Sequence, residues 1–258
     1  MSTTALPLSG RVAVITGGTS GIGLALVRGL AQAGADVVPI SRRKEQVDAA
    51  ASEVESMGRR SARITADVSD RQSLDDASRQ TISAFSKIDI LVNCAGITKR
   101  TPTIDVSDEE WQSIVDTNLS GTFRACQVFG RHMLERAYGR IINIASLASF
   151  VGLFEVAAYT ASKAGVAGLT RALAVEWGSR GVNVNAIAPG VYRTDLNAKL
   201  LDGTERGKEF LLRTPLRRFG RVEELAGACV FLASDAASFI NGEVLAVDGG
   251  FLASGVNQ

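Results

Sequence analysis

Tyr159 and Lys163 are the residues whose types and spacing suggest chemistry most directly. They stand four apart in a segment of helical period, so their side chains share one helix face. A tyrosine has a reference pKa of about 10, which an adjacent ammonium would lower by favouring the phenolate. Ser146 follows an apolar run, and its hydroxyl could hydrogen-bond a reacting oxygen. The trio predicts proton transfer at an oxygen, although a Tyr-Lys pair is also common on helix surfaces.

A glycine-rich segment near the N-terminus predicts an anion site. It follows an apolar run at 11–16, opens a helix pattern, and contains Gly17, Thr19, Ser20, Gly21, Ile22 and Gly23. Glycines let backbone N–H groups approach a pyrophosphate, and the helix presents its N-terminal dipole to that charge. A tight strand-helix turn could also use these glycines, but the position after the first buried strand favours dinucleotide binding.

The residues after the second apolar run bear on the choice of dinucleotide. A carboxylate at this position, about 20 residues past the loop, would bind the ribose 2′-OH of NAD. Here Ser41 is followed by Arg42 and Arg43. Two guanidiniums could pair with a 2′-phosphate, and no carboxylate would repel it. We therefore expect NADP(H) as the cofactor; the alternative is a solvated basic helix start.

Short apolar runs alternate with segments of helical length along the whole chain. The expected strands cover 11–16, 36–41, 61–65, 88–93, 139–145, 182–187 and 243–247. Runs without polar interruption are typical of parallel strands covered on both faces. Helices are expected at 20–33 and 43–57, and capping boxes at Ser107 and Ser69 would open two more. The alternation predicts an α/β fold, a single doubly wound Rossmann domain over 1–258 with a seven-stranded parallel sheet and helices on both faces.

The carboxyl ends of parallel strands meet at one edge of the sheet, so further loops should lie over the cofactor. Asp67 and Val68 follow the third expected strand and could meet the adenine. Asn93, Ala95 and Gly96 follow the fourth, where small residues permit close approach to a ribose. Each of these segments could equally be an ordinary loop.

Taken in order, these pieces resemble the short-chain dehydrogenase/reductase family over nearly the whole chain, together with Asn118, Pro189, Gly190 and Thr194. The resemblance implies a tetrad of Asn118, Ser146, Tyr159 and Lys163. In it Tyr159 exchanges the proton, Ser146 orients the reacting oxygen, Lys163 lowers the pKa of the tyrosine and binds the nicotinamide ribose, and Asn118 holds a water. It also implies that Pro189, Gly190, Val191 and Thr194 border the nicotinamide and pyrophosphate, and that the protein is a homotetramer. Cys94 stands where the family more often has a second asparagine, and we expect only a local packing change.

Composition excludes several other classes. The net charge is +1 without runs of like charge, which disfavours nucleic acid and anionic membranes as partners. One histidine and three scattered cysteines make a metal site or a disulfide framework improbable. No stretch has the length of a membrane span, and the first ten residues lack the pattern of a secretory signal. We expect a cytoplasmic protein acting on a small molecule.

The substrate should lie among the loops 97–103, 147–158 and 191–216, the last long enough for a helical lid. Arg100 could clamp a carboxylate or be a solvated loop charge, and Leu147 belongs to the apolar middle loop. The segment 96–102 and the tail 248–256 resemble family members acting on sugar acids, such as gluconate 5-dehydrogenases. The alternatives are a 3-oxoacyl or broad ketone reductase and, in another class, a protein that binds NADP(H) without turnover.

Overall fold

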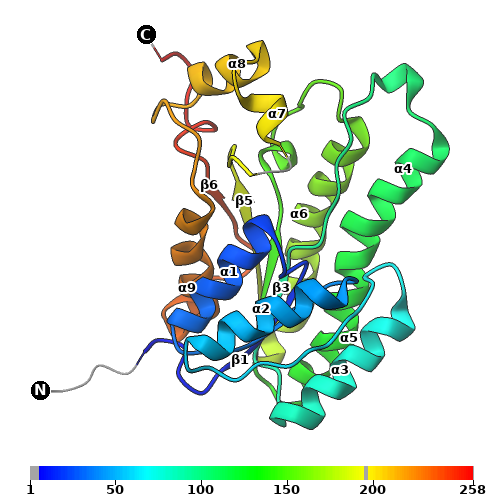
Figure 1. Ribbon diagram of the computed structural model, residues 1–258, viewed down its shortest axis with the longest axis vertical. Coiled ribbons are helices and arrows are strands. Elements are labelled where there is room, and N and C mark those ends of the chain that lie inside the picture. Colours follow the sequence, from blue (N-terminus) through cyan, green and yellow to red (C-terminus); the bar gives the residue numbers. More distant parts are fainter. Residues whose placement is uncertain (1–5, 195–196, 258) are drawn as a thin grey trace, which may run out of the picture.

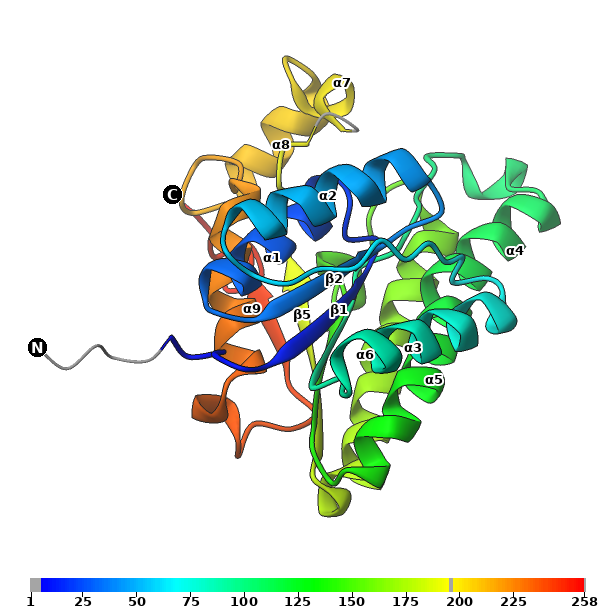
Figure 2. The ribbon, with the colours of Figure 1, turned by 60° about the horizontal axis from the view of Figure 1, so that its bottom comes forward.

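The computed structural model describes residues 6–194 and 197–257, which contain one parallel β-sheet between two layers of helices (Figures 1 and 2). Its six strands pair in the order β2-β1-β3-β4-β5-β6. They are β1 Val12–Thr16, β2 Asp36–Ile40, β3 Ile90–Asn93, β4 Gly139–Ile144, β5 Val182–Pro189 and β6 Val244–Val247. The reversal of direction along the order, between β1 and β3, is the hallmark of a doubly wound sheet.

The expectation of seven strands is wrong for the described residues. The segment 61–65 runs beside β2 but forms only an isolated bridge between Ser41 and Thr65. Val37 N–H donates to the carbonyl of Arg60 and Ala66 N–H to that of Ser41, so odd-numbered residues of β2 face this segment. Pro39 lies between them and has no N–H to donate, which interrupts the ladder.

The helices alternate with these strands. They are α1 Gly21–Gln32, α2 Lys44–Ser56, α3 Arg71–Phe85, α4 Asp108–Val115, α5 Gly121–Glu135, α6 Ala157–Trp177, α7 Ala198–Leu201, α8 Glu205–Arg213 and α9 Ala226–Ala233. The expected capping residue Ser107 accepts a hydrogen bond from Glu110 N–H at 3.2 Å. At α3 the cap is Asp70, not Ser69, because Asp70 accepts from Gln72 N–H at 2.9 Å.

Alternate residues of the strands pack into two cores, one on each face. Val14 of β1 and Leu91 of β3 pack in the cluster beneath α3, α5 and α6. Their neighbours Ile15 and Val92 pack in the cluster beneath α1 and α9. Period-2 burial on both faces explains the continuous apolar runs, because each strand buries both of its sides. Figure 2 shows α1 and α9 on one side of the sheet and α3, α5 and α6 on the other.

Candidate active site

The turn between β1 and α1 is built from glycines that cannot be replaced without movement. Gly17 has φ +69°, and a Cβ on it would lie 2.7 Å from the backbone of Ala95. A Cβ on Gly23 would lie 2.0 Å from the carbonyl oxygen of Gly17. The turn therefore lies directly against the segment after β3. Ser20 caps α1 in an extended conformation without a side-chain hydrogen bond, which leaves the helix N-terminus suited to an anion.

The end of β2 carries an unpartnered polar group. The Ser41 hydroxyl is buried and finds no hydrogen-bond partner among the described residues. Arg42 is 74% exposed and lies 3.9 Å from a carboxylate oxygen of Asp67, and Arg43 is the N-terminal cap of α2. A buried hydroxyl without a partner among the described residues, beside two exposed cations and a glycine turn, fits the ribose and phosphate end of an NAD(P) cofactor.

Asp67 and Val68 lie beside this position with their side chains already engaged. Asp67 accepts from the Ser69 N–H at 2.9 Å and from the Ser69 hydroxyl at 2.7 Å. Burial raises the pKa of Asp67, but these bonds together with Arg42 and Arg124 outweigh it, so the net pKa is lowered. Val68 is 8% exposed and packs in the core cluster on the α5 side of the sheet.

Asn93 is directed into the sheet. Its amide donates to Asn143 Oδ1 at 2.9 Å, and Asn143 in turn donates to Thr170 Oγ1 of α6 at 3.0 Å. This chain of amides links β3, β4 and α6. Sequence reasoning missed Asn143 and Thr170, for which the only available signal was a polar residue inside an apolar run. Ala95 and Gly96 remain close to the glycine turn and to the catalytic candidates, as expected.

Asn118 lies in a π-helical turn, Asp116–Ser120, between α4 and α5. It is completely buried, accepts from Ile97 N–H at 2.8 Å, and donates to the Ile97 carbonyl at 2.9 Å and to Ser162 Oγ at 3.1 Å. A Cβ on Gly96 would lie 3.2 Å from Asn118 Oδ1 and 3.7 Å from Lys163 Nζ. The structure thus brings Asn118 and Lys163 to the same point beside the loop after β3.

Ser146, Tyr159 and Lys163 meet at the carboxyl end of β4. Ser146 is 8% exposed, and its Oγ accepts from Ala148 N–H at 3.1 Å, which leaves its own proton to donate. Lys163 is 6% exposed, donates from Nζ to the Ile144 carbonyl at 2.7 Å, and lies 5.8 Å from the centre of the Tyr159 ring. The expected grouping of the three side chains is therefore present.

The electrostatics of this cluster differ from the expectation. Burial raises the pKa of the Tyr159 phenol, and a hydrogen bond from Ser146 only partly opposes it. Burial also lowers the pKa of Lys163 to about 8, a change opposed by Cys94. The phenol is accordingly protonated at neutral pH. Burial raises the pKa of the Cys94 thiol to about 11, so Cys94 is a neutral neighbour and not a nucleophile.

The segment after β5 returns to the glycine turn. A Cβ on Gly190 would lie 2.6 Å from Asp248 Cα, while Thr194 Cγ2 would lie 3.8 Å from a Cβ on Gly21. Pro189 ends β5, and the Val191 carbonyl accepts from Gly220 N–H at 2.9 Å. These contacts place the residues expected around the nicotinamide and pyrophosphate at the same sheet edge as the catalytic candidates.

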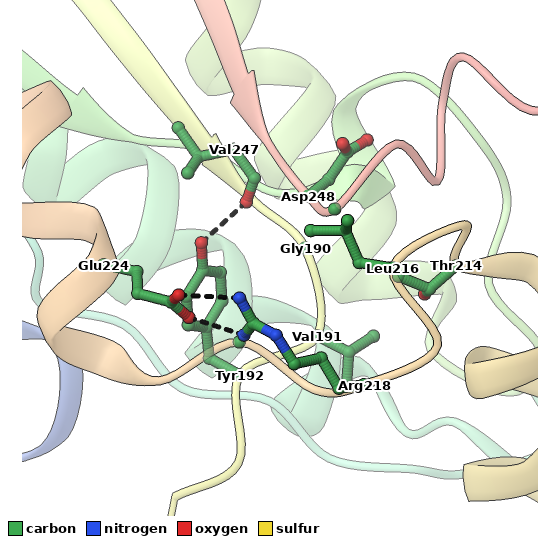
Figure 3. Close-up of a pocket in the computed structure, with 11 residues that line it drawn as sticks. Gly190, Val191, Tyr192, Thr214, Leu216, Arg218, Glu224, Val247 and Asp248 are labelled. Atoms are coloured by element: carbon green, nitrogen blue, oxygen red, sulfur yellow. Dashed lines mark hydrogen bonds and ion pairs between the residues drawn. The ribbon is translucent and has the colours of Figure 1, made fainter.

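A small cavity of about 130 Å³ lies beneath this segment (Figure 3). Tyr192 donates to the Val247 carbonyl at 2.9 Å on one side of it, and Arg218 forms a two-point ion pair with Glu224 on the other. Burial raises the pKa of Tyr192 to about 12, so this phenol stays a donor. Its lining residues do not include Ser146, Tyr159 or Lys163, so this cavity is distinct from the catalytic candidates. The bonds around it support the segment after β5.

An ion pair joins two of the expected substrate loops, 97–103 and 147–158, and a second joins the first of these loops to α4. Arg100 Nε donates to Glu155 Oε2 at 2.6 Å, and Lys99 pairs with Glu110 at 2.5 Å. Arg100 is thus not a free loop charge. Leu147 is only 2% exposed, so it forms the wall behind Ser146 with little accessible surface. The long segment after β5 contains α7 and α8 above the carboxyl ends of the strands (Figure 1).

In the described part of the chain, His, Cys, Asp and Glu residues form no group able to hold a metal ion. Among the same residues, no helix combines the length and apolar character needed to cross a bilayer.

Comparison with known proteins places this geometry in a family. Residues 17–252 match the family described as "Enoyl-(Acyl carrier protein) reductase". The chain is 41% identical to a gluconate 5-dehydrogenase of Gluconobacter oxydans, with 96% of both chains covered. It is 43% identical to a 2-dehydro-3-deoxy-D-gluconate 5-dehydrogenase of Bacillus subtilis, over 96% of this chain and 97% of the relative. A 3-oxoacyl-[acyl-carrier-protein] reductase of Synechocystis is 40% identical over 95% of this chain and 98% of its own.

Among solved structures, a gluconate 5-dehydrogenase from Burkholderia cenocepacia in complex with NADP and tartrate superimposes with a TM-score of 0.94. It is 38% identical, over 97% of this chain and 98% of that one. The chain is a member of the short-chain dehydrogenase/reductase family, an NAD(P)-dependent oxidoreductase acting on the CH–OH or carbonyl group of small alcohols and ketones.

Proposed function

We propose that the protein interconverts a secondary alcohol and a ketone of a sugar acid such as gluconate, with NADP(H) as the preferred cofactor. The observation that carries the reaction is the meeting of Ser146, Tyr159 and Lys163 at the carboxyl end of β4. When bound, the nicotinamide supplies or accepts the hydride. We assign the catalytic roles to Asn118, Ser146, Tyr159 and Lys163.

In the reductive direction Tyr159 gives its phenolic proton to the oxygen of the carbonyl. Its raised pKa keeps that proton in place at neutral pH. Ser146 keeps its proton and donates a hydrogen bond from its hydroxyl to the same oxygen, since its Oγ already accepts a bond from Ala148 N–H. The Lys163 cation stabilises the phenolate that remains after transfer. Asn118 holds the loop of Ile97 beside Lys163, and the role that we assign to it is to hold a water through which the proton returns.

Cofactor preference rests on the residues at the end of β2. The buried, unpartnered Ser41 hydroxyl and the exposed Arg42 and Arg43 support a 2′-phosphate at this position. The glycine turn from Gly17 to Gly23 supports the pyrophosphate. The NADP in the Burkholderia relative is consistent with the same choice.

A sugar acid is favoured by the cations Lys99 and Arg100 on the loop after β3, and by the relatives named for gluconate and its derivatives. The tartrate in the Burkholderia structure is also a hydroxy acid. A 3-oxoacyl thioester is the second candidate, because Phe154 is 70% exposed and Phe150 49% exposed on the middle loop. Gluconate oxidation with NADP would favour the first substrate, and reduction of an acetoacetyl thioester the second.

The assay that tests the reaction is Tyr159→Phe. We expect kcat to fall by about 100- to 10,000-fold, because the proton donor is lost, while NADPH binding followed by fluorescence is kept. Tyr138→Phe is the matched control. Tyr138 precedes β4, at the end of the strand opposite to Ser146, and its phenol donates a hydrogen bond to Asp235. Retention of turnover by Tyr159→Phe contradicts the role. Loss of NADPH binding in that variant would point to disruption of the site instead.

We also propose that residues 1–258 act as one catalytic domain and that the protein assembles as a homotetramer. Two apolar side chains support an assembly, because Val175 of α6 is 86% exposed and Phe239, before β6, is fully exposed. Light scattering should give four times the chain mass of 27.2 kDa. A mass of one chain contradicts the tetramer without affecting the catalytic proposal.

A further inference from the structure

Three charged residues from three different segments of the chain meet beside the proposed substrate site. Arg100 comes from the loop after β3, Glu155 from the loop before α6, and Arg206 from the first turn of α8. Arg100 Nε donates to Glu155 Oε2 at 2.6 Å. Arg206 Nη1 donates to the backbone carbonyl of Phe154, the residue before Glu155, at 3.2 Å.

The charges of this cluster do not balance. Glu155 forms its ion pair with Arg100. In the part of the chain that the structure describes, Arg206 forms no ion pair of its own. Burial and the nearby Arg100 lower the pKa of Arg206, while Glu155 and Glu209 raise it only from a distance. A guanidinium carries five N–H donors, and among the described residues the acceptor found for Arg206 is one neutral carbonyl. The cluster is therefore one negative charge short.

Packing holds the Arg206 guanidinium in place. It lies 5.4 Å from the centre of the Phe210 ring, which in turn lies 6.2 Å from the Phe251 ring. Across the mouth, Thr101 N–H donates to the Glu155 carbonyl at 2.9 Å. Glu155 has φ +60°, a left-handed conformation that a non-glycine residue adopts only where its surroundings impose it. Contacts therefore hold the cluster on both sides.

The position of the cluster suits one part of a substrate. The three segments follow the carboxyl ends of β3, β4 and β5, the sheet edge that also carries Ser146, so the cluster lies at the same edge as the proposed catalytic residues. The carboxylate of a sugar acid is several bonds away from the hydroxyl that is oxidised, so a group that binds it belongs at the entrance. The N-terminus of α6, at Ala157, adds a favourable dipole for an anion there.

We propose that Arg206 is a specificity-determining residue that binds the carboxylate of the substrate, while Glu155 holds Arg100 in its place at the rim. The inference rests on the proposed function and deepens it, because it names the group that separates hydroxy acids from neutral polyols. A planar guanidinium binds a carboxylate through two parallel hydrogen bonds, which a lysine cannot reproduce. The selection therefore acts on substrate binding and not on the proton transfer.

The test compares gluconate with galactitol, a neutral polyol of the same chain length, as substrates with NADP. Arg206→Ala is expected to raise the KM for gluconate by about tenfold or more, with kcat changed little and both constants for galactitol unchanged. Arg206→Lys should recover part of the gluconate KM. Lys208→Ala is the matched control, because Lys208 is 66% exposed on the same helix and pairs with Glu205 at 2.7 Å; it should behave as wild type.

An unchanged gluconate KM in Arg206→Ala overturns the assignment, and so does an equal loss with both substrates. Thermal stabilisation of Arg206→Ala by NADP reports whether the variant folds and binds its cofactor. Thermal stabilisation of the NADP complex by gluconate, present in wild type and lost in Arg206→Ala, supports the assignment without relying on turnover. If wild type oxidises galactitol and neither binds nor oxidises gluconate, the sugar-acid function and this inference fail together. If wild type oxidises gluconate and the Arg206 variants do so equally well, only this inference fails.

Discussion

Replacement of Arg42 by alanine isolates the choice between NADP(H) and NAD(H). The Arg42 side chain is 74% exposed, and its ion pair with Asp67 spans 3.9 Å. An exposed pair of this kind contributes about 0–1 kcal/mol to folding, so the unfolding free energy should hardly change. A charge-assisted hydrogen bond to a 2′-phosphate is worth about 1.5–3 kcal/mol. The kcat/KM with NADPH is therefore expected to fall about 10- to 150-fold, at 1.36 kcal/mol per tenfold.

The same assay with NADH supplies the contrast, since NADH lacks the 2′-phosphate and its kcat/KM should stay within about twofold. Lys44→Ala is the control, because Lys44 is 73% exposed two residues along and pairs with Asp48 at 2.5 Å. Its loss should leave both cofactors unaffected. A parallel fall with NADPH and NADH in Arg42→Ala, or no fall with NADPH, refutes the reasoning from the end of β2.

Two further predictions concern proton transfer and loop stability. Burial raises the pKa of Tyr159 and lowers that of Lys163 to about 8. The kcat/KM for reduction should therefore stay constant through neutral pH and fall as the pH rises past about 8, where Lys163 loses its charge. The kcat/KM for oxidation, which needs the phenolate, should rise with pH until Lys163 loses its proton. A kcat/KM for reduction that already falls below pH 7 as the pH rises would contradict this assignment. Asn118→Ala leaves the N–H and carbonyl of Ile97 unpaired, and urea unfolding should show a loss of about 2–4 kcal/mol; a loss below about 1 kcal/mol would mean that water replaces the amide.

The fold was largely predictable because periodicity reports burial, and burial on both faces specifies a parallel sheet. The seventh strand failed for a local reason that was already visible in the sequence: Pro39 removes a donor from the edge that faces residues 61–65. At α3, Ser69 and Asp70 were both acceptable caps by type. The hydroxyl of Ser69 instead bonds Asp67, and this leaves the cap to Asp70.

In the candidate site, residue types and the family pattern predicted a role for Ser146, Tyr159, Lys163 and Asn118, and the structure brings these side chains together. Spacing alone could not give the state of charge, since the effect of Lys163 on Tyr159 depends on burial that no local pattern reports. Arg206 was equally out of reach. It acquires its neighbours Phe154 and Glu155 only when α8 folds back over a loop some fifty residues earlier in the chain.

The amide chain from Asn93 through Asn143 to Thr170 fixes the axial position of α6 against the sheet. Sliding the helix by one turn would strand several buried polar groups without partners, a penalty far above that of repacking aliphatic side chains. Tyr159 and Lys163 on α6 are therefore held in place independently of the loops after the strands. Directed evolution of those loops should change which substrates bind, while the positions of Tyr159 and Lys163 relative to the sheet stay the same.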